Sequence, residues 1–193
     1  MMIKTLISST LALALILALP LGASAQGNTI EVVMKTSKGD MVIELYPDKA
    51  PLSVKNFLTY VDEKFYDGTI FHRVIESFMI QGGGWTPDFT QKPVNETIRN
   101  EADNGLKNER YTIGLGRRMD PHSASAQFYI NHIDNPDLDH TAKTEDGWGY
   151  CVFGKVIQGT EIVEAIAQVK IMTKNNMQDV PRQTIEIVSV RRK

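Results

Sequence analysis

Residues 71–84 read FHRVIESFMIQGGG and place an arginine, two large apolar side chains and a glutamine within two short strands and a turn. The first strand carries Phe71, His72 and Arg73 in succession, and the second ends at Gln81. Because successive side chains of a strand point to opposite faces, Phe71 and Arg73 would lie on one face and His72 on the other. We expect Arg73 to share a face with Gln81 on the adjacent strand.

A two-residue period dominates the chain on either side of this stretch. Runs rich in β-branched and aromatic residues, bounded by turn residues, are typical of strands. The sequence SKGD at residues 37–40 predicts a hairpin between the first two runs. In all we predict eight strands, at residues 30–36, 41–46, 69–74, 78–81, 111–115, 127–131, 150–156 and 184–190.

Two segments have the spacing of amphipathic helices. The first begins at Ala50-Pro51, where proline suits the first helical turn, and ends near Lys64. The second runs from about Thr160, which we expect to be the N-cap, to Gln168. The apolar residues of the first helix recur with helical spacing at Val54, Phe57, Leu58 and Val61.

These elements favour a mainly β fold in one domain. Eight short strands with two helices do not alternate as β-α-β units, which argues against a parallel sheet. We predict a closed eight-stranded antiparallel β-barrel capped by two α-helices, because closure leaves no exposed strand edge. Residues 85–111 are polar with weak periodicity and predict a long irregular loop, which is a common place for function.

The composition excludes several classes of protein. With 42% hydrophobic and 23% charged residues, the 193-residue chain has an ordinary globular composition. Its 21 basic and 23 acidic residues leave a formal net charge of -2. This balance argues against a protein that binds nucleic-acid phosphates or an anionic membrane surface.

Motifs for several kinds of chemistry are missing from the sequence. It lacks the Gly-x-Ser-x-Gly of serine hydrolases, and its four histidines lack the HExxH spacing of a zinc site. Cys151 is the single cysteine and lies in an apolar run, so we expect a small buried side chain rather than a disulfide or a reactive thiol. We therefore expect neither a metal nor another cofactor.

The N-terminal segment differs from the rest of the chain. Lys4 gives a short positive start, residues 11–19 are an unbroken apolar run, and Ala23-Ser24-Ala25 supplies small residues. This three-part pattern is that of a secretory signal peptide, and the apolar run is too short to span a bilayer. We predict a signal peptide at residues 1–25 and a single domain at residues 26–193. The mature protein would be exported, into the periplasm, and free of the membrane.

Several segments besides residues 71–84 carry a family resemblance. They are FYDGTI at 65–70, NE at 100–101, AQFYI at 126–130 and VFGKV at 152–156. In this order, across residues 30–190, they resemble the cyclophilin-type peptidyl-prolyl cis-trans isomerases. Residues 147–151, GWGYC, are similar to the bacterial branch, which together with the signal peptide indicates an exported member.

The resemblance implies an activity and a set of site residues. The substrate would be a polypeptide that contains proline, and the X-Pro bond would rotate without a cofactor. Arg73 would be the catalytic arginine, Gln81 would hold the substrate backbone and orient the arginine, and His72 would give structural support. The resemblance assigns further substrate contacts to Phe78, Met79, Gly116, Arg117, Gln127, Phe128, Tyr129 and Leu138.

Two positions depart from the family pattern. Many relatives carry an aromatic residue just before the pocket leucine, and it is tryptophan in those most sensitive to cyclosporin. This chain carries Asp137 there, so we expect weak binding of cyclosporin. Tyr129 stands where the family usually has phenylalanine, and its hydroxyl needs a partner if it is buried.

An alternative from another class is a non-catalytic proline-peptide binding module or chaperone on the same scaffold. Arg73 and Gln81 favour the enzyme, because binding alone would need only the apolar pocket. We expect the protein to act as a monomer on proline-containing polypeptides.

Overall fold

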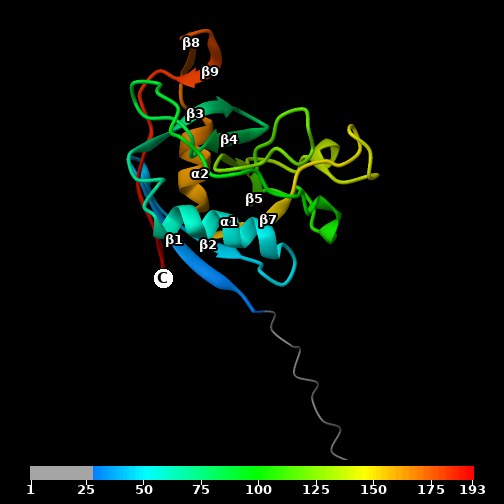
Figure 1. Ribbon diagram of the computed structural model, residues 1–193. Helices are drawn as coiled ribbons and strands as arrows, with labels where there is room; N and C mark the ends of the chain where they lie inside the picture. The colour runs from blue at the N-terminus through cyan, green and yellow to red at the C-terminus, as the bar shows by residue number, and fades with distance from the viewer. Residues whose placement is uncertain (1–27) are drawn as a thin grey trace, which may run out of the picture.

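Eight antiparallel strands close into a barrel in the computed structural model, which describes residues 28–193 (Figure 1). They are β1 (Ile30–Thr36), β2 (Gly39–Leu45), β3 (Thr69–Ile75), β4 (Met79–Gly82), β5 (Thr112–Leu115), β6 (Phe128–Asn131), β7 (Val152–Gln158) and β10 (Glu186–Arg192). Their order around the barrel is β1-β10-β3-β4-β6-β5-β7-β2, and β2 pairs again with β1. The predicted fold is confirmed. The predicted signal peptide at residues 1–25 lies outside the described residues.

All eight predicted strands belong to this barrel, and each end lies within two residues of its expected position. β1 and β2 form the predicted hairpin, in which Thr36 pairs with Gly39 across the turn. The Thr36 hydroxyl donates to the Gly39 carbonyl oxygen at 2.8 Å. Every second residue along much of both strands is buried, which is the alternation that made these strands recognisable in the sequence.

A second, two-stranded sheet is absent from the sequence-based prediction. It consists of β8 (Ile171–Lys174) and β9 (Met177–Pro181), and it stands above the barrel at the top of Figure 1. β8 contains no buried residue, so it lacks the alternation that reveals a half-buried strand. A signal was available in Asn175-Asn176, whose φ values of 52° and 61° belong to the left-handed turn that asparagine tolerates.

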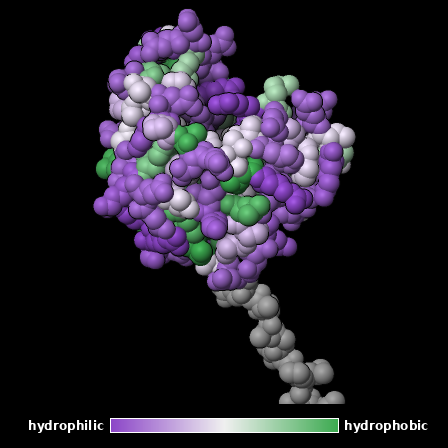
Figure 2. Space-filling view, viewed as in Figure 1, coloured by the Kyte–Doolittle hydropathy of each residue, from purple (hydrophilic) through white to green (hydrophobic). Residues whose placement is uncertain are grey.

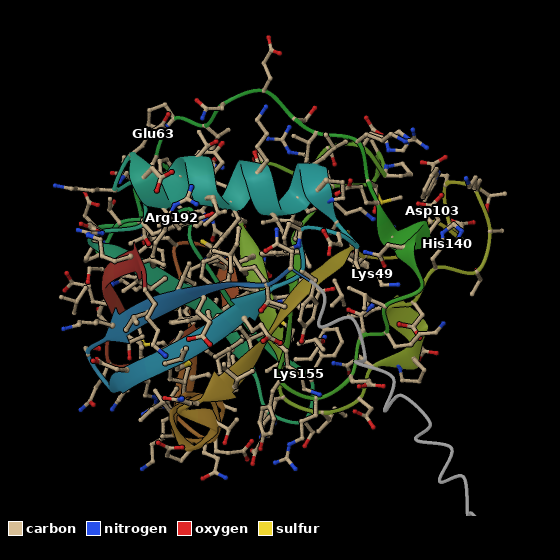
Figure 3. All side chains as sticks on the ribbon, turned by 90° about the horizontal axis from the view of Figure 1, so that it is seen from below. Lys49, Glu63, Asp103, His140, Lys155 and Arg192 are labelled. Atoms are coloured by element: carbon tan, nitrogen blue, oxygen red, sulfur yellow. The ribbon has the colours of Figure 1, made fainter. Side chains whose placement is uncertain are left out.

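The first helix, α1 (Pro51–Asp62), has proline in its first turn, as predicted. Ala50 precedes the helix without offering a side-chain cap, and the Glu101 carboxylate takes that role. It accepts hydrogen bonds from the backbone N–H groups of Leu52 and Ser53 at 3.0 and 2.8 Å. Because Glu101 belongs to the long loop between β4 and β5, this loop anchors the start of the helix. Figure 3 shows α1 lying across the strands, with Arg192 of β10 beneath it.

The second helix, α2 (Thr160–Ala167), corrects one prediction. Thr160 is the first helical residue rather than the N-cap, which is Gly159 with a φ of 79°. A Cβ atom at Gly159 would lie 2.3 Å from the carbonyl oxygen of Asp40, so the left-handed turn into the helix requires glycine. The backbone geometry of the turn, and not a capping hydroxyl, sets where α2 begins.

Aromatic rings from α1 and the barrel meet in the core. The ring of Phe57 lies 5.1, 5.9 and 5.3 Å from those of Tyr66, Phe128 and Phe153, centroid to centroid. All four side chains are fully buried, in the same cluster as the apolar face of α2. Because packed side chains fill the barrel interior, a binding site is to be sought on the outside of the strands.

The connection from β4 to β5 is the predicted long irregular loop, and it contains the 3-10 helix η1 (Ala102–Asn104). A second 3-10 helix, η2 (Pro136–Leu138), follows β6. Within residues 28–193, no helix is long and apolar enough to cross a membrane. Figure 2 shows a face of the molecule that is mostly hydrophilic, with apolar side chains in small separate groups.

Candidate active site

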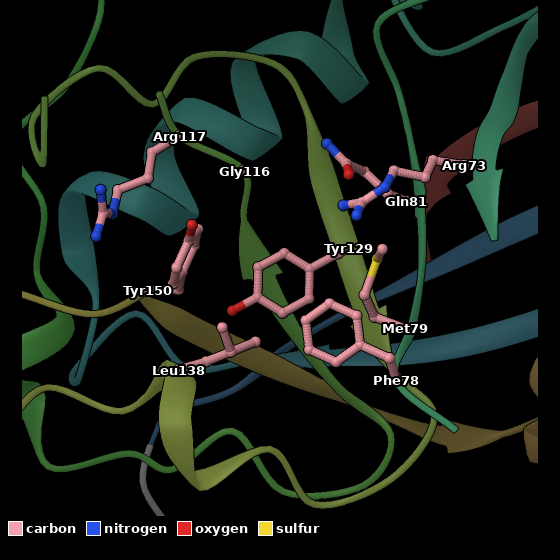
Figure 4. Close-up of a pocket in the computed structure, with 9 residues that line it drawn as sticks. All are labelled: Arg73, Phe78, Met79, Gln81, Gly116, Arg117, Tyr129, Leu138 and Tyr150. Carbon is pink, nitrogen blue, oxygen red and sulfur yellow. The ribbon is translucent and has the colours of Figure 1, made fainter. Parts of the chain in front are cut away.

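A pocket of about 360 Å³ opens where β3, β4 and β6 run side by side (Figure 4). It gathers residues from β3, β4 and β6, from the end of β5, from η2 and from the segment before β7. Both predicted catalytic residues and six of the eight predicted substrate contacts line it. The lining residues are Arg73, Phe78, Met79, Gln81, Gly116, Arg117, Tyr129, Leu138 and Tyr150.

A β-bulge in β3 sets the direction of Arg73. Phe71 pairs with Gly82 and Arg73 pairs with Gln81, so β3 has one more residue than β4 between these pairs. The extra residue, His72, breaks the alternation, as a bulge does. Phe71 is therefore buried in the core while Arg73 lines the pocket. The prediction that Phe71 and Arg73 share a face is wrong. The prediction that Arg73 shares a face with Gln81 is confirmed, because the two residues pair and both line the pocket.

The strands β4 and β6 divide their side chains between the core and the pocket. Met79 and Gln81 line the pocket while Ile80 between them is fully buried. In the same way Tyr129 lines the pocket, and its neighbour Phe128 is fully buried against Phe57. The prediction that Phe128 contacts substrate is therefore corrected, because adjacent residues of a strand point to opposite faces and Phe128 supports the pocket from the core.

Gln127 lies beside the pocket rather than in its lining. Its side-chain oxygen accepts a hydrogen bond from Gln81 Nε2 at 3.1 Å. The Gly116 N–H donates to the Gln127 carbonyl oxygen at 2.8 Å, which joins the residue after β5 to the residue before β6. Gln127 thus holds the Gln81 amide in place. Within residues 28–193 the other polar atoms of this amide have no hydrogen-bond partner, so they can face a ligand.

The Tyr129 hydroxyl has the partner that its burial requires. It donates to Asn108 Oδ1 at 2.6 Å, and burial raises the pKa of this phenol well above 10.0. Asn108 is itself held by Asp139 Oδ1, which accepts from its backbone N–H at 2.8 Å and from its side chain at 3.1 Å. Because Asp139 follows Leu138, one network fixes both the floor and a wall of the pocket.

Arg117 and Tyr150 form the rim opposite Arg73 (Figure 4). The Arg117 guanidinium carbon lies 4.5 Å from the centre of the Tyr150 ring, and Nε donates to the Gly149 carbonyl oxygen at 3.0 Å. This stacking is a cation-π contact. Tyr150 is the lining residue that the sequence analysis did not assign to the site, since only the folded chain brings the start of β7 next to the end of β5.

His72 is buried and does not line the pocket. Burial, followed by the neighbouring charge of Arg73, lowers the pKa of this histidine from 6.5 to about 4. Among the described residues, its Nδ1 atom has no hydrogen-bond partner. A neutral, buried ring at the bulge fits the predicted supporting role better than a role in proton transfer.

The groups at this site offer hydrogen bonds and a fixed positive charge. Burial raises the pKa of the Cys151 thiol to about 12, so it is a poor nucleophile. Within residues 28–193, no group of histidine, cysteine and carboxylate side chains is arranged to hold a metal ion. What the pocket offers a ligand is an apolar surface of Phe78, Met79 and Leu138 with the Arg73 guanidinium at its edge.

Comparison with known proteins gives a consistent result. Residues 31–192 match the family model for cyclophilin type peptidyl-prolyl cis-trans isomerases. The chain is 54% identical to peptidyl-prolyl cis-trans isomerase cyp18 of Streptomyces antibioticus over 160 residues, which cover 83% of this chain and 96% of the relative. It is 50% identical to peptidyl-prolyl cis-trans isomerase B of Escherichia coli K12, over 82% of this chain and 97% of that protein.

Solved structures agree with the sequence relatives. A crystal structure of a Cryptosporidium parvum cyclophilin type peptidyl-prolyl cis-trans isomerase superposes with a TM-score of 0.69 at 25% identity, and covers 86% of this chain and 98% of that one. A crystal structure of the same protein in the presence of the dipeptide Ala-Pro gives a TM-score of 0.67, with 84% of this chain and 98% of that chain covered.

Tyr129→Phe tests the anchoring of the pocket floor. Loss of the hydroxyl leaves the ring in place but removes a buried hydrogen bond, so we expect the free energy of unfolding to fall by about 1 to 2 kcal/mol in urea denaturation. Tyr150→Phe is the matched control, because the Tyr150 hydroxyl has no hydrogen-bond partner within residues 28–193. Equal losses in the two variants would contradict the anchoring role.

The pKa of His72 predicts a pH dependence of stability. The unfolded chain binds a proton at this residue near pH 6.5, and the folded protein does so only near pH 4. The contribution of His72 to the free energy of unfolding is therefore full above pH 6.5 and is lost as the pH falls toward 4. His72→Gln should remove on the order of 3 kcal/mol from the fall in unfolding free energy between these pH values. Urea titrations at several pH values measure this slope, and identical slopes in both proteins would rule the effect out.

Proposed function

Because this chain belongs to the cyclophilin-type peptidyl-prolyl cis-trans isomerase family, we propose that Arg73 is the group that catalyses the reaction. The protein is a peptidyl-prolyl cis-trans isomerase, and it accelerates rotation about the peptide bond before proline. The position of Arg73 is the observation that carries this proposal. The bulge sets it directly opposite Gln81, at the edge of a pocket with apolar walls.

The barrier to this reaction is electronic. Resonance between the carbonyl group and the nitrogen keeps the peptide bond planar, with a rotation barrier of about 20 kcal/mol. Uncatalysed exchange of an X-Pro bond takes tens to hundreds of seconds. As the bond twists, resonance is lost and an electron pair returns to the prolyl nitrogen. A donor held at this nitrogen stabilises the twisted state more than either planar state, which is the condition for catalysis.

The pocket supplies the parts for such a mechanism. The proline ring would lie on Tyr129 between Phe78, Met79 and Leu138, with the Arg73 guanidinium directed at the prolyl nitrogen. Gln81, fixed by Gln127, would hold the adjoining backbone so that one side of the bond stays still while the other rotates. Arginine suits this task because it stays protonated and offers several N–H donors. The steps require no nucleophile and no proton transfer.

The substrates would be proline-containing segments in an extended conformation. A related crystal structure was determined in the presence of Ala-Pro, which agrees with a pocket that accepts the proline side of the bond. The exposed Asp137 beside Leu138 replaces an apolar rim with a charge. We expect this charge to weaken the binding of the apolar ligand cyclosporin. Asp137 does not line the proline pocket, so the pocket itself is unaffected.

The signal-peptide pattern of residues 1–25 supports export, so the substrates would be proteins that fold outside the cytoplasm. The protein would assist their folding where X-Pro rotation is a slow step.

Arg73→Ala tests the catalytic proposal. Removing one preorganised donor should cost about 2 to 4 kcal/mol of transition-state stabilisation, which corresponds to a loss of about 30- to 1000-fold in kcat/KM. A protease-coupled assay of a proline peptide with purified protein measures it. Arg118→Ala is the matched control, because Arg118 is an exposed arginine outside the pocket lining and its loss should leave kcat/KM unchanged. Full activity of Arg73→Ala would disprove the proposal.

The export proposal is tested with the full chain expressed in a bacterium that has two membranes. We expect osmotic shock to release a protein whose intact mass corresponds to a chain that begins at Gln26. A variant that lacks residues 11–19 should stay uncleaved in the cytoplasm. An uncleaved wild-type chain that stays in the cytoplasm would show that residues 1–25 are not a signal peptide.

A further inference from the structure

The hairpin of β8 and β9 brings a carboxylate to Arg73. Asp179 Oδ2 lies 3.8 Å from Arg73 Nε. We propose that Asp179 is a positioning residue, which holds the Arg73 guanidinium toward the proline pocket and thereby raises the rate of bond rotation. This inference rests on the proposed catalytic role of Arg73 and adds a second residue that acts through it.

Arg73 needs such a partner because little else restrains its side chain. It is 42% exposed, and its guanidinium makes no hydrogen bond within the part of the chain that the structure describes. An arginine side chain has many rotamers, and an undirected guanidinium would seldom meet the prolyl nitrogen. Among residues 28–193, Asp179 is the one carboxylate in ion-pair contact with it.

The shortest contact between the two side chains is at Arg73 Nε. Asp179 approaches Nε, the nitrogen nearest the backbone, so both terminal Nη groups stay available to a ligand. Figure 4 shows the guanidinium directed toward Gln81 and the interior of the pocket. An ion pair at Nε thus restrains the plane of the guanidinium and leaves its outer donors free.

Asp179 is itself held in a defined position. Its φ of 60° lies in the left-handed region, which aspartate enters more readily than most residues. Val180 and Pro181, which follow it, are buried and pair with Met172 and Ile171 of β8. β9 packs against β3, the strand that carries Arg73. The backbone therefore places Asp179 beside Arg73 independently of the contact between the two side chains.

The hairpin of β8 and β9 is braced from a second side, near its turn. Lys174 Nζ at the end of β8 lies 4.5 Å from the centre of the Phe89 ring, in the loop after β4. The hairpin is thus tied both to β3 and to the loop that follows β4. The bulge in β3 directs the Arg73 backbone, and the braced hairpin directs its side chain.

A carboxylate near a guanidinium can also act in the opposite sense, since it partly neutralises the positive charge that stabilises the twisted bond. Both side chains are partly exposed, so water weakens this effect as it weakens the ion pair itself. If orientation dominates, loss of the carboxylate lowers kcat. If neutralisation dominates, the same change raises kcat. The sign of the change in kcat therefore distinguishes the two effects.

The test is the steady-state kinetics of Asp179→Asn, which keeps the shape of the side chain and removes its charge. We expect kcat to fall about two- to fivefold, the scale of a partly exposed ion pair, with KM and Tm unchanged. Gln178→Ala, at an exposed position on the same strand, is the matched control and should match wild type. Added salt should lower kcat of the wild type toward that of the variant, because salt screens the pair.

A double-mutant cycle separates this inference from the function on which it rests. In an Arg73→Ala background, Asp179→Asn should leave the residual activity unchanged, because Asp179 would act only through Arg73. An unchanged or higher kcat in Asp179→Asn, or an equal loss in both backgrounds, would overturn the positioning role. High activity of Arg73→Ala alone would instead overturn the proposed function.

Discussion

The bulge at His72 is the constraint on which the site depends. Without an extra residue, strict alternation would place Arg73 on the side of Phe71, inside a core that has no room for a charge. With it, one short strand supplies an aromatic ring to the core and a guanidinium to the pocket. The bulged residue is a histidine that is neutral and buried, so the irregular backbone is packed rather than exposed.

The polar groups that support the pocket are hydrogen-bonded to one another behind its surface. Asn108 joins the Tyr129 hydroxyl to Asp139, and Gln127 fixes the Gln81 amide. These bonds leave an apolar surface facing the ligand while satisfying the polar atoms beneath it. A site that stabilises a twisted bond through fixed donors gains from such preorganisation, because little reorganisation is needed as the bond rotates.

The sequence predicts the parts of the fold that alternation reveals, and it misses the parts that depend on register. The eight barrel strands have a buried face, so the sequence predicts them. β8 contains no buried residue, and the sequence therefore gives no alternation that would predict it. The bulge is invisible in FHRV because pairing, and not residue type, defines it. Phe128 was assigned to the pocket because family resemblance does not say which face a neighbour takes. Tyr150 and Asp179 reach the site only through contacts between segments distant in sequence.

The closed barrel has a consequence for how the protein meets unfolded chains. Unfolded chains carry unpaired amides that add readily to any open row of strand hydrogen bonds, and this is how β-sheet templates capture them. In the barrel each strand already has a hydrogen-bonded neighbour on both sides, so no barrel strand is an open sheet edge, and the open edges lie in the small sheet of β8 and β9. In the proposed function a substrate is therefore held at the proline pocket and through Gln81, and the barrel does not take it up as an additional strand.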